Sequence, residues 1–258
     1  GSGPNSVFAA DMDNDGDMDI VSALEGDDTI AWYENDGASD PSWSTAAIAA
    51  SAENPHSVFA ADMDNDGDMD ILSASENDNT IAWYENDGAS DPRWTAADIA
   101  TNASGAWSVF AADMDNDGDM DVVSASFFDD SIAWYENKDN SEPIWSYETD
   151  DDIHWTAISS DGEYIAGASF DGKVYLFDKD SSTPLWSYDT DDYVYCVALS
   201  ADGEYIVAGS RNNKAYLFDK DSSTPLWNYT VDYGKTVGEV SVSAETSSAI
   251  LPLLQTST

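Results

Sequence analysis

The residues of this chain best suited to chemistry are aspartates in three short acidic segments. Each segment reads Asp-x-Asp-x-Asp-Gly-Asp-x-Asp, which places five carboxylates within nine residues. Carboxylates at this density repel one another strongly unless a cation lies among them. An oxygen-only ligand set suits calcium, whereas magnesium demands a tighter octahedral geometry, so we predict three structural calcium sites. The predicted metal-ligating residues are Asp11, Asp13, Asp15, Asp17 and Asp19; Asp62, Asp64, Asp66, Asp68 and Asp70; and Asp113, Asp115, Asp117, Asp119 and Asp121.

The positions within each segment are expected to play different parts. The carboxylates at the first, third, fifth and ninth positions are predicted to bind the ion, and the seventh residue is predicted to bind it through its backbone oxygen. Glycine at the sixth position, Gly16 in the first segment, permits the sharp turn that this arrangement needs. The twelfth position holds Ser22 and not the glutamate of an EF-hand. One such segment alone could be a solvated acidic turn, but three copies in register favour metal binding.

The acidic segments belong to a repeat, and a different repeat follows it. The stretch Ser6–Asp19 recurs twice more at a period of 51 residues, and each copy runs on to the sequence Ile-Ala-Trp-Tyr-Glu-Asn. In the second repeat Trp145 recurs as Trp186 and as Trp227, a period of 41 residues. Repeats of this length are typical of solenoids and propellers.

Both repeats read as four short strands separated by turns. In the third strand of the first repeat, Ile30 and Trp32 point to one side while Ala31 and Tyr33 point to the other, so both faces are apolar. A strand buried on both faces fits a sheet packed between two neighbouring sheets, as in propeller blades. The expected strands are residues 7–10, 20–23, 29–33 and 44–48 in the first repeat, and residues 154–159, 164–168, 173–177 and 185–188 in the second.

We therefore predict an all-β fold, a β-propeller of four-stranded antiparallel blades. The repeats give five full blades, three of the first type and two of the second, with a partial blade or a closing segment at the C-terminus. Two open half-propellers are the alternative, but these would expose apolar faces and strand edges. The expected parts of one propeller domain are residues 1–5 as a linker or expression-vector remnant, 6–140 as three blades, 141–233 as two blades, and 234–258 as the partial blade or closing segment.

Each acidic segment lies between a Val-Phe-Ala-Ala strand and a strand such as Ile-Val-Ser-Ala. In this setting the Asp-x-Asp-x-Asp-Gly-x-x-Asp pattern resembles the FG-GAP/VCBS repeats that form the blades of integrin α-chain propellers and occur in many secreted microbial proteins. The resemblance covers about residues 6–140. It implies a propeller, calcium on the three loops, and an extracellular or cell-surface location.

Residues 141–233 resemble WD-repeat blades and the blades of PQQ-type quinoproteins. The resemblance lies in the stretch Asp-Gly-Lys-Val-Tyr-Leu-Phe-Asp at residues 171–178, which is followed by Leu185 and Trp186. The Trp-Asp dipeptide of WD repeats is replaced here by Phe177 and Asp178. A quinoprotein enzyme needs about eight blades and a cofactor site. The resemblance therefore implies the fold and not redox chemistry.

The composition limits the classes of partner. The chain has 258 residues, enough for one large all-β domain or two ordinary ones, and its 52 acidic against 8 basic residues give a net charge of -44. Nucleic acid and anionic membranes are excluded as partners because phosphate binding needs lysine and arginine. Three divalent ions would still leave about -38, so most of the acidity belongs to a solvated surface. No apolar run reaches the length of a membrane span.

Other candidate functional residues have simpler interpretations. His56 and His154 are expected to be structural, since neither lies in a serine or cysteine constellation that could support nucleophilic catalysis. Cys196 is the only cysteine, so no intrachain disulfide can form, and its strand position indicates core packing. The tryptophans recur at blade spacing, which favours packing over a sugar-binding platform.

The function that these observations favour is a non-catalytic, calcium-stabilised binding module outside the cell or on its surface. Its partner is expected to be a protein or a polysaccharide, and the chain is expected to be a monomer. One alternative is a polysaccharide-active enzyme on the same scaffold, which needs acid and base residues converging near the central channel. The other is a structural hybrid propeller, natural or engineered, without a ligand. Near-identical repeats argue against the enzyme, because catalytic sites are usually asymmetric.

Overall fold

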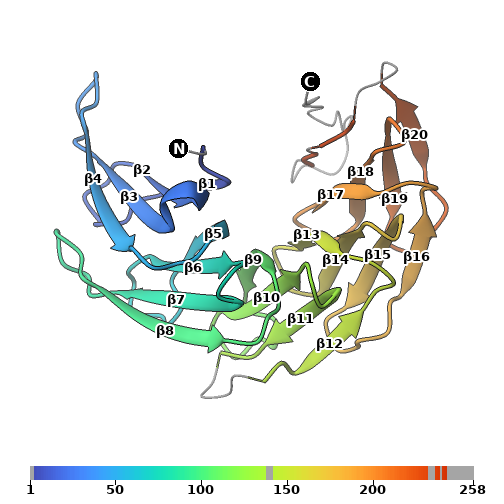
Figure 1. Cartoon of the computed structure of the whole chain (residues 1–258), viewed down its shortest axis with the longest axis horizontal. Helices are drawn as coiled ribbons and strands as arrows, with labels where there is room; N and C mark the ends of the chain where they lie inside the picture. Colours follow the sequence, from blue (N-terminus) through green and yellow to red (C-terminus); the bar gives the residue numbers. More distant parts are fainter. Residues whose placement is uncertain (1–2, 138–141, 232–235, 239, 243–258) are drawn as a thin grey trace. The chain divides into compact units, whose positions relative to one another are not determined.

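The structure is a computed structural model that describes residues 3–137, 142–231, 236–238 and 240–242. Within these residues the chain forms five four-stranded sheets and one short 3-10 helix, η1 (Glu25–Asp27). In every sheet, strands that are neighbours in sequence are also neighbours in space (Figure 1). This up-and-down strand order is the order found in propeller blades. The predicted all-β fold of four-stranded antiparallel blades is confirmed.

The first repeat supplies the first two sheets and most of the third. The first sheet contains β1 (Ser6–Ala10), β2 (Asp19–Leu24), β3 (Thr29–Asn35) and β4 (Trp43–Ala49). The second contains β5 (Pro55–Ala61), β6 (Asp70–Ser75), β7 (Thr80–Asn86) and β8 (Trp94–Ala100). The third contains β9 (Ala106–Ala112), β10 (Asp121–Ser126), β11 (Ser131–Tyr135) and β12 (Trp145–Glu148).

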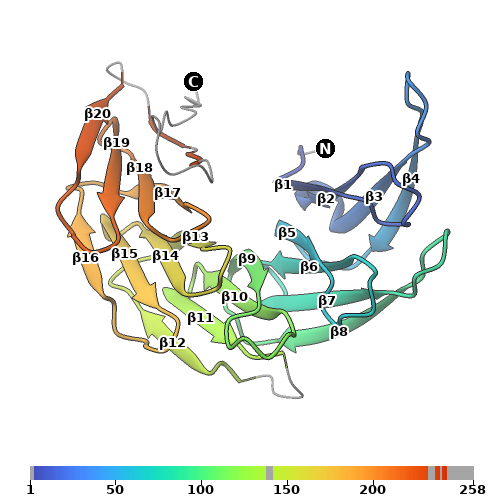
Figure 2. The same cartoon turned by 180° about the vertical axis from the view of Figure 1, so that it is seen from behind.

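The second repeat supplies the remaining two sheets, which Figure 2 shows from behind. The fourth sheet contains β13 (Ile153–Ile158), β14 (Tyr164–Ser169), β15 (Lys173–Asp178) and β16 (Trp186–Asp189). The fifth contains β17 (Val194–Leu199), β18 (Tyr205–Ser210), β19 (Lys214–Asp219) and β20 (Trp227–Thr230).

The predicted strands are confirmed, with ends that differ by no more than two residues. The third sheet takes its fourth strand, β12, from the second repeat, because β11 pairs with β12 from Ser131–Glu148 to Trp134–Trp145. A hairpin turn connects β14 and β15, and Gly172 in this turn adopts a positive φ of +89°. Asn213, at the matching place before β19, has a φ of 66°.

The chain divides into two compact units, and the boundary passes through the third sheet. Unit 1 comprises Gly1–Ala111, Gly118–Ser124 and Tyr135–Ile144, and unit 2 comprises Ala112–Asp117, Ala125–Trp134 and Trp145–Thr258. The expected closure into one ring stays a prediction. Of the expected partial blade or closing segment at residues 234–258, only residues 236–238 and 240–242 are described.

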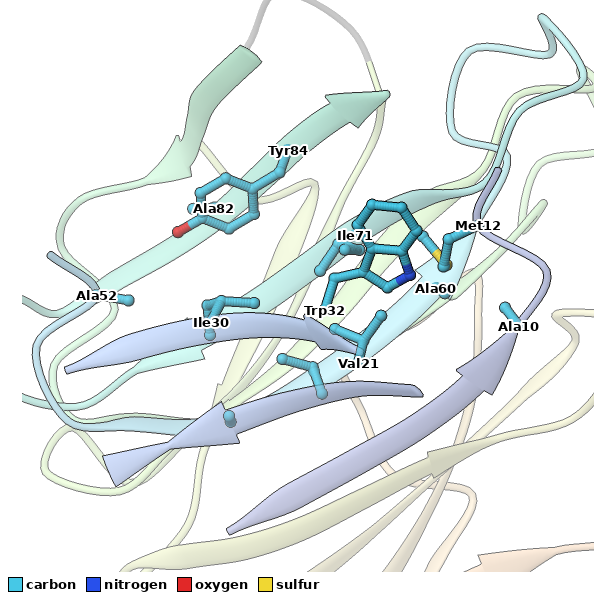
Figure 3. Close-up of a cluster of buried hydrophobic side chains, with 12 residues drawn as sticks. Ala10, Met12, Val21, Ile30, Trp32, Ala52, Ala60, Ile71, Ala82 and Tyr84 are labelled. Carbon is cyan, nitrogen blue, oxygen red and sulfur yellow. The ribbon is translucent and has the colours of Figure 1, made fainter. Parts of the chain in front are cut away.

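The core of unit 1 forms where the first sheet packs on the second. Val21, Ile30 and Trp32 of the first sheet belong to one buried cluster with Ile71 and Tyr84 of the second (Figure 3). All five side chains are at most 6% exposed. Complete burial of an aliphatic or aromatic side chain contributes about 1.5–3 kcal/mol, so this contact is a main source of the stability of unit 1.

The other face of the first sheet is exposed. Val7 is 61% exposed and Trp43 is 44% exposed, whereas Val58, the repeat equivalent of Val7, is 4% exposed beneath the first sheet. An apolar cavity of about 340 Å³ lies on this face. The cavity is lined by Pro4, Val7, Ile20, Ser22, Leu24, Tyr33 and Trp43.

The core of unit 2 forms in the same way between the fourth and fifth sheets. Val174 and Leu176 of β15 share a buried cluster with Val194 and Val197 of β17. Cys196 is 5% exposed in a further cluster, beside Val237, so the prediction that it packs in the core is confirmed. Among the described residues, no helix has the length and apolar character needed to cross a membrane.

Candidate metal centre

The three acidic segments form the loops between the first and second strands of the first three sheets. In the first loop Met12, next to the first aspartate, is fully buried and anchors the loop to the core. Gly16 at the sixth position has a φ of +94°, and Gly67 and Gly118 repeat this conformation at +97° and +101°. A side chain at this position would strain the backbone, so the predicted role of the glycine in the turn is confirmed.

Carboxylates converge in each of the three loops. In every group, one carboxylate oxygen from each of three aspartates lies within 4.8 Å of the others. The members are the first, third and fifth positions in the first two loops, and the first, third and ninth positions in the third loop. These groups are Asp11, Asp13 and Asp15; Asp62, Asp64 and Asp66; and Asp113, Asp115 and Asp121.

Hydrogen bonds from the backbone hold the first loop in its curled shape. Asp11 accepts hydrogen bonds from the amide of Asp15 (3.2 Å) to Oδ1 and of Gly16 (3.0 Å) to Oδ2. Asp15 Oδ1 accepts one from the amide of Asp17 at 2.9 Å. The second loop repeats all three bonds at 3.1, 3.1 and 2.9 Å. Alternate carboxylates are therefore turned inward by the chain itself.

The ninth aspartate of each loop is buried and accepts a backbone hydrogen bond, and in the first two loops both of its oxygens do so. In the second loop, Asp70 is 1% exposed, and its two oxygens accept hydrogen bonds from the amides of Met63 (3.0 Å) and Asn86 (2.8 Å). Burial raises the pKa of Asp70 to about 6, although these two amides lower it. The indole N–H of Trp83 lowers it further, from a position that falls short of a full hydrogen bond. Asp70 therefore fixes the loop to β7 as well as bordering the carboxylate group.

The seventh aspartates turn their side chains away from the carboxylate groups. Asp68 Oδ1 accepts a hydrogen bond of 2.6 Å from Nδ2 of Asn14, in the preceding loop. Asp119 Oδ1 accepts the equivalent bond of 2.9 Å from Nδ2 of Asn65. In the first loop, Asp17 lies against the backbone of Gly37, where an added Cβ would clash with its carboxylate. The seventh side chains are thus occupied elsewhere, which leaves their backbone oxygens as the groups that could face an ion.

The charges in the loops fit a divalent cation. Burial, followed by the charge of Asp15, raises the pKa of Asp13 above its usual value, and burial and Asp66 do the same to Asp64. Burial and neighbouring carboxylates are the causes that raise these pKa values, and both would be offset by a bound cation. Since every side-chain donor is a carboxylate oxygen, the set suits a hard ion such as calcium. The residues present therefore fit the ion that the sequence predicts.

Sequence reasoning missed the asparagines that connect the loops. Asn14 and Asn65, at the fourth loop position, both have a φ of 59° and donate to the next loop. Asn86, at the end of β7, donates from Nδ2 to the carbonyl of Met12 in the preceding loop at 2.8 Å. These asparagines recur in every copy of the repeat, and this recurrence could have marked them as important. Their role as links could not be predicted, because it depends on which loops are neighbours in space.

The two histidines occupy packed positions. His56 stacks on Trp107 with ring centroids 3.7 Å apart, and its Nε2 lies 3.0 Å from Glu76 Oε2. His154 stacks on Phe170 at 5.0 Å, and its Nδ1 lies 2.8 Å from a backbone carbonyl. These stacking and polar contacts give both histidines a structural role in the fold.

A cavity of about 420 Å³ opens in unit 2 beside the turn between β14 and β15. The rings of Phe170 and Tyr193 stack in its wall at 4.8 Å, and the guanidinium of Arg211 lies 5.2 Å from the centre of the Tyr193 ring. Rings with nearby carboxylates suit a cationic group on an aliphatic stem. The cavity is lined by Phe170, Asp171, Gly172, Asp189, Asp191, Asp192 and Tyr193.

Comparison with known proteins agrees with this division into two repeat types. The model of the FG-GAP-like repeat matches residues 11–73 and 62–124, so it spans all three acidic loops. The model of the WD domain, G-beta repeat, matches residues 141–178 and 182–219. No curated protein matches the chain with significant similarity. Both repeat families indicate a β-propeller-like interaction module. The chain thus joins FG-GAP-like repeats in its first half to WD domain, G-beta repeats in its second.

Proposed function

We propose that the chain is a non-catalytic interaction module whose scaffold is stabilised by three calcium ions, one on each acidic loop. The observation that carries the proposal is the convergence of three carboxylates in three equivalent loops. Each loop can supply these oxygens together with the backbone oxygen of its seventh residue. Because the loop itself provides most of the ligands, the ion has a structural role and is not a reaction centre.

An extracellular or cell-surface location is part of the same proposal. Four of the converging carboxylates, those of Asp15, Asp64, Asp66 and Asp115, are exposed to water. Calcium-binding modules outside cells bind the ion at about 10⁻⁴–10⁻³ M. Calcium is present at that concentration outside cells. The net charge of -44 opposes self-association and favours a monomer.

The partner is a protein or a polysaccharide, and the charge of the chain favours cationic groups on it. The cavity beside Tyr193 offers carboxylates and aromatic rings to such groups. The alternative of a polysaccharide-active enzyme finds less support, because the three acidic loops are near-identical copies whereas catalytic sites are usually asymmetric. Turnover of any polysaccharide by the purified chain would overturn the non-catalytic assignment.

Equilibrium dialysis against calcium tests the metal part of the proposal. We expect three ions per chain, and magnesium at the same concentration should bind more weakly because the open loops do not impose octahedral geometry. The variant Asp13→Asn should bind two ions, whereas Asp40→Asn, at an exposed position outside the loops, should still bind three. A chain that takes up no calcium contradicts the proposal.

A further inference from the structure

A continuous series of hydrogen bonds connects the first two acidic loops through the protein interior. The amide of Asn86 donates to Asp70 Oδ1 at 2.8 Å, and Nδ2 of the same residue donates to the carbonyl of Met12 at 2.8 Å. The amide of Met12 in turn donates to Asp19 Oδ2 at 3.2 Å. The ninth aspartate of the second loop is therefore joined to that of the first by two intervening residues.

The same series joins the second loop to the third. The amide of Asn137 donates to Asp121 Oδ1 at 2.9 Å, and its Nδ2 donates to the carbonyl of Met63 at 2.7 Å. The amide of Met63 then donates to Asp70 Oδ2 at 3.0 Å. Asp70 is thus bonded from both directions, and Asp70 and Asp121 are each 1% exposed.

A second link runs across the loops themselves. Asn14 donates to Asp68 at 2.6 Å, and Asn65 donates to Asp119 at 2.9 Å and also to the carbonyl of Gly118. Each asparagine stands between the third and fifth positions of its own loop, so its conformation depends on the order of that loop. Each acceptor is the seventh residue of the next loop, whose backbone oxygen is a proposed ligand.

We propose that the three loops bind calcium cooperatively, with each ion ordering the asparagines that position the ligands of the neighbouring loop. This inference rests on the proposed function. The coupling is positive because an ion in one loop removes conformational freedom that the next ion would otherwise have to remove. Five carboxylates in each loop leave it negative after one ion has bound, so repulsion between ions does not reverse the sign. Asn14, Asn65, Asn86 and Asn137 are the positioning residues.

A calcium titration of the full chain by calorimetry tests the coupling. The unchanged chain should bind three ions with a Hill coefficient above 1. Asn65→Gly removes the direct bond from the second loop to the third without straining the positive φ, and it leaves the interior series through Asn137 in place. It should lower the Hill coefficient and weaken overall affinity by about fivefold, the lower end of typical coupling factors. Asn116→Gly is the matched control, because Asn116 has the same conformation (φ 61°) but no acidic loop of this type follows it.

The interior link has its own matched pair. Asn86→Ala breaks the bond to Met12 together with two bonds inside its own sheet, to Met69 and Gly88, and should lower cooperativity. Within the described part of the chain, Asn35→Ala, at the equivalent place in the first sheet, removes the two corresponding bonds, to Met18 and Gly37, and no bond to another loop. Melting each variant in chelator shows whether it is folded before the titration. Three independent sites in the unchanged chain, or equal behaviour of the paired variants, contradict the coupling alone. Absence of calcium binding contradicts the proposed function as well.

Discussion

Removal of calcium is expected to lower the melting temperature of unit 1 by about 10–20 °C. Each ion that binds only the folded state contributes about 2.7 kcal/mol when calcium is at 100 times its dissociation constant. Unit 1 contains two complete acidic loops, so removal of calcium lowers its free energy of unfolding by about 5 kcal/mol. A loss of 1 kcal/mol lowers the melting temperature of a domain of this size by several degrees. Circular dichroism melting curves in calcium and in excess chelator measure the shift.

This experiment needs a control that separates the effect of a changed net charge from the effect of lost calcium binding. The double variant Asp13→Asn, Asp64→Asn should lose most of the calcium-dependent shift, because it removes one converging carboxylate from each of two loops. The pair Asp40→Asn, Asp91→Asn changes the net charge equally at exposed sites and should keep the shift. Equal melting curves with calcium and with chelator contradict the stabilising role of the metal.

The substitution Phe177→Ala is expected to destabilise unit 2 by about 3–5 kcal/mol, the usual loss when a buried phenylalanine is truncated. Phe177 is fully buried. Its ring centroid lies 5.6 Å from that of Trp145 and 5.2 Å from that of Tyr147. Removal of the ring therefore leaves a cavity between β15 and aromatic side chains of the neighbouring sheet. Urea unfolding followed by tryptophan fluorescence measures the loss.

An exposed phenylalanine provides the control for this loss. Phe128 is 58% exposed, so Phe128→Ala should change the free energy of unfolding by less than about 1 kcal/mol. If both variants unfold at the same urea concentration, Phe177 does not have the central place in the core that its burial indicates.

The strands could be predicted because each repeat shows the same apolar alternation several times over. A strand such as β3 carries apolar residues on both faces, and this pattern is visible within four consecutive residues of the sequence. The acidic loops were predictable for a similar reason, since their spacing is set within nine consecutive residues. The turn at Gly16 needs no information from elsewhere in the chain.

The contacts between repeats were beyond prediction from the sequence. Whether Asn14 donates a hydrogen bond to Asp68 or only to water depends on which loops are adjacent in space and on how two separate sheets are aligned. The part that Asp70 plays in fixing its loop to β7 could not be predicted for the same reason. The spacing of the acidic residues does not reveal that the Asp70 carboxylate also accepts a hydrogen bond from the amide of Asn86. The switch to β12 in the third sheet could be placed approximately, because Trp145 marks the second repeat.

The packing of the first sheet on the second has an evolutionary consequence. One face of the first sheet, which carries Val21 and Trp32, packs against the face of the second sheet that carries Val58 and Tyr84. The two copies of the repeat are nearly identical in sequence. Such a head-to-tail joint is heterologous and does not close on itself in pairs. Tandem duplication of the 51-residue unit therefore supplies, with each added copy, the surface on which the next copy packs. In this chain the series stops where the sequence changes to the other repeat.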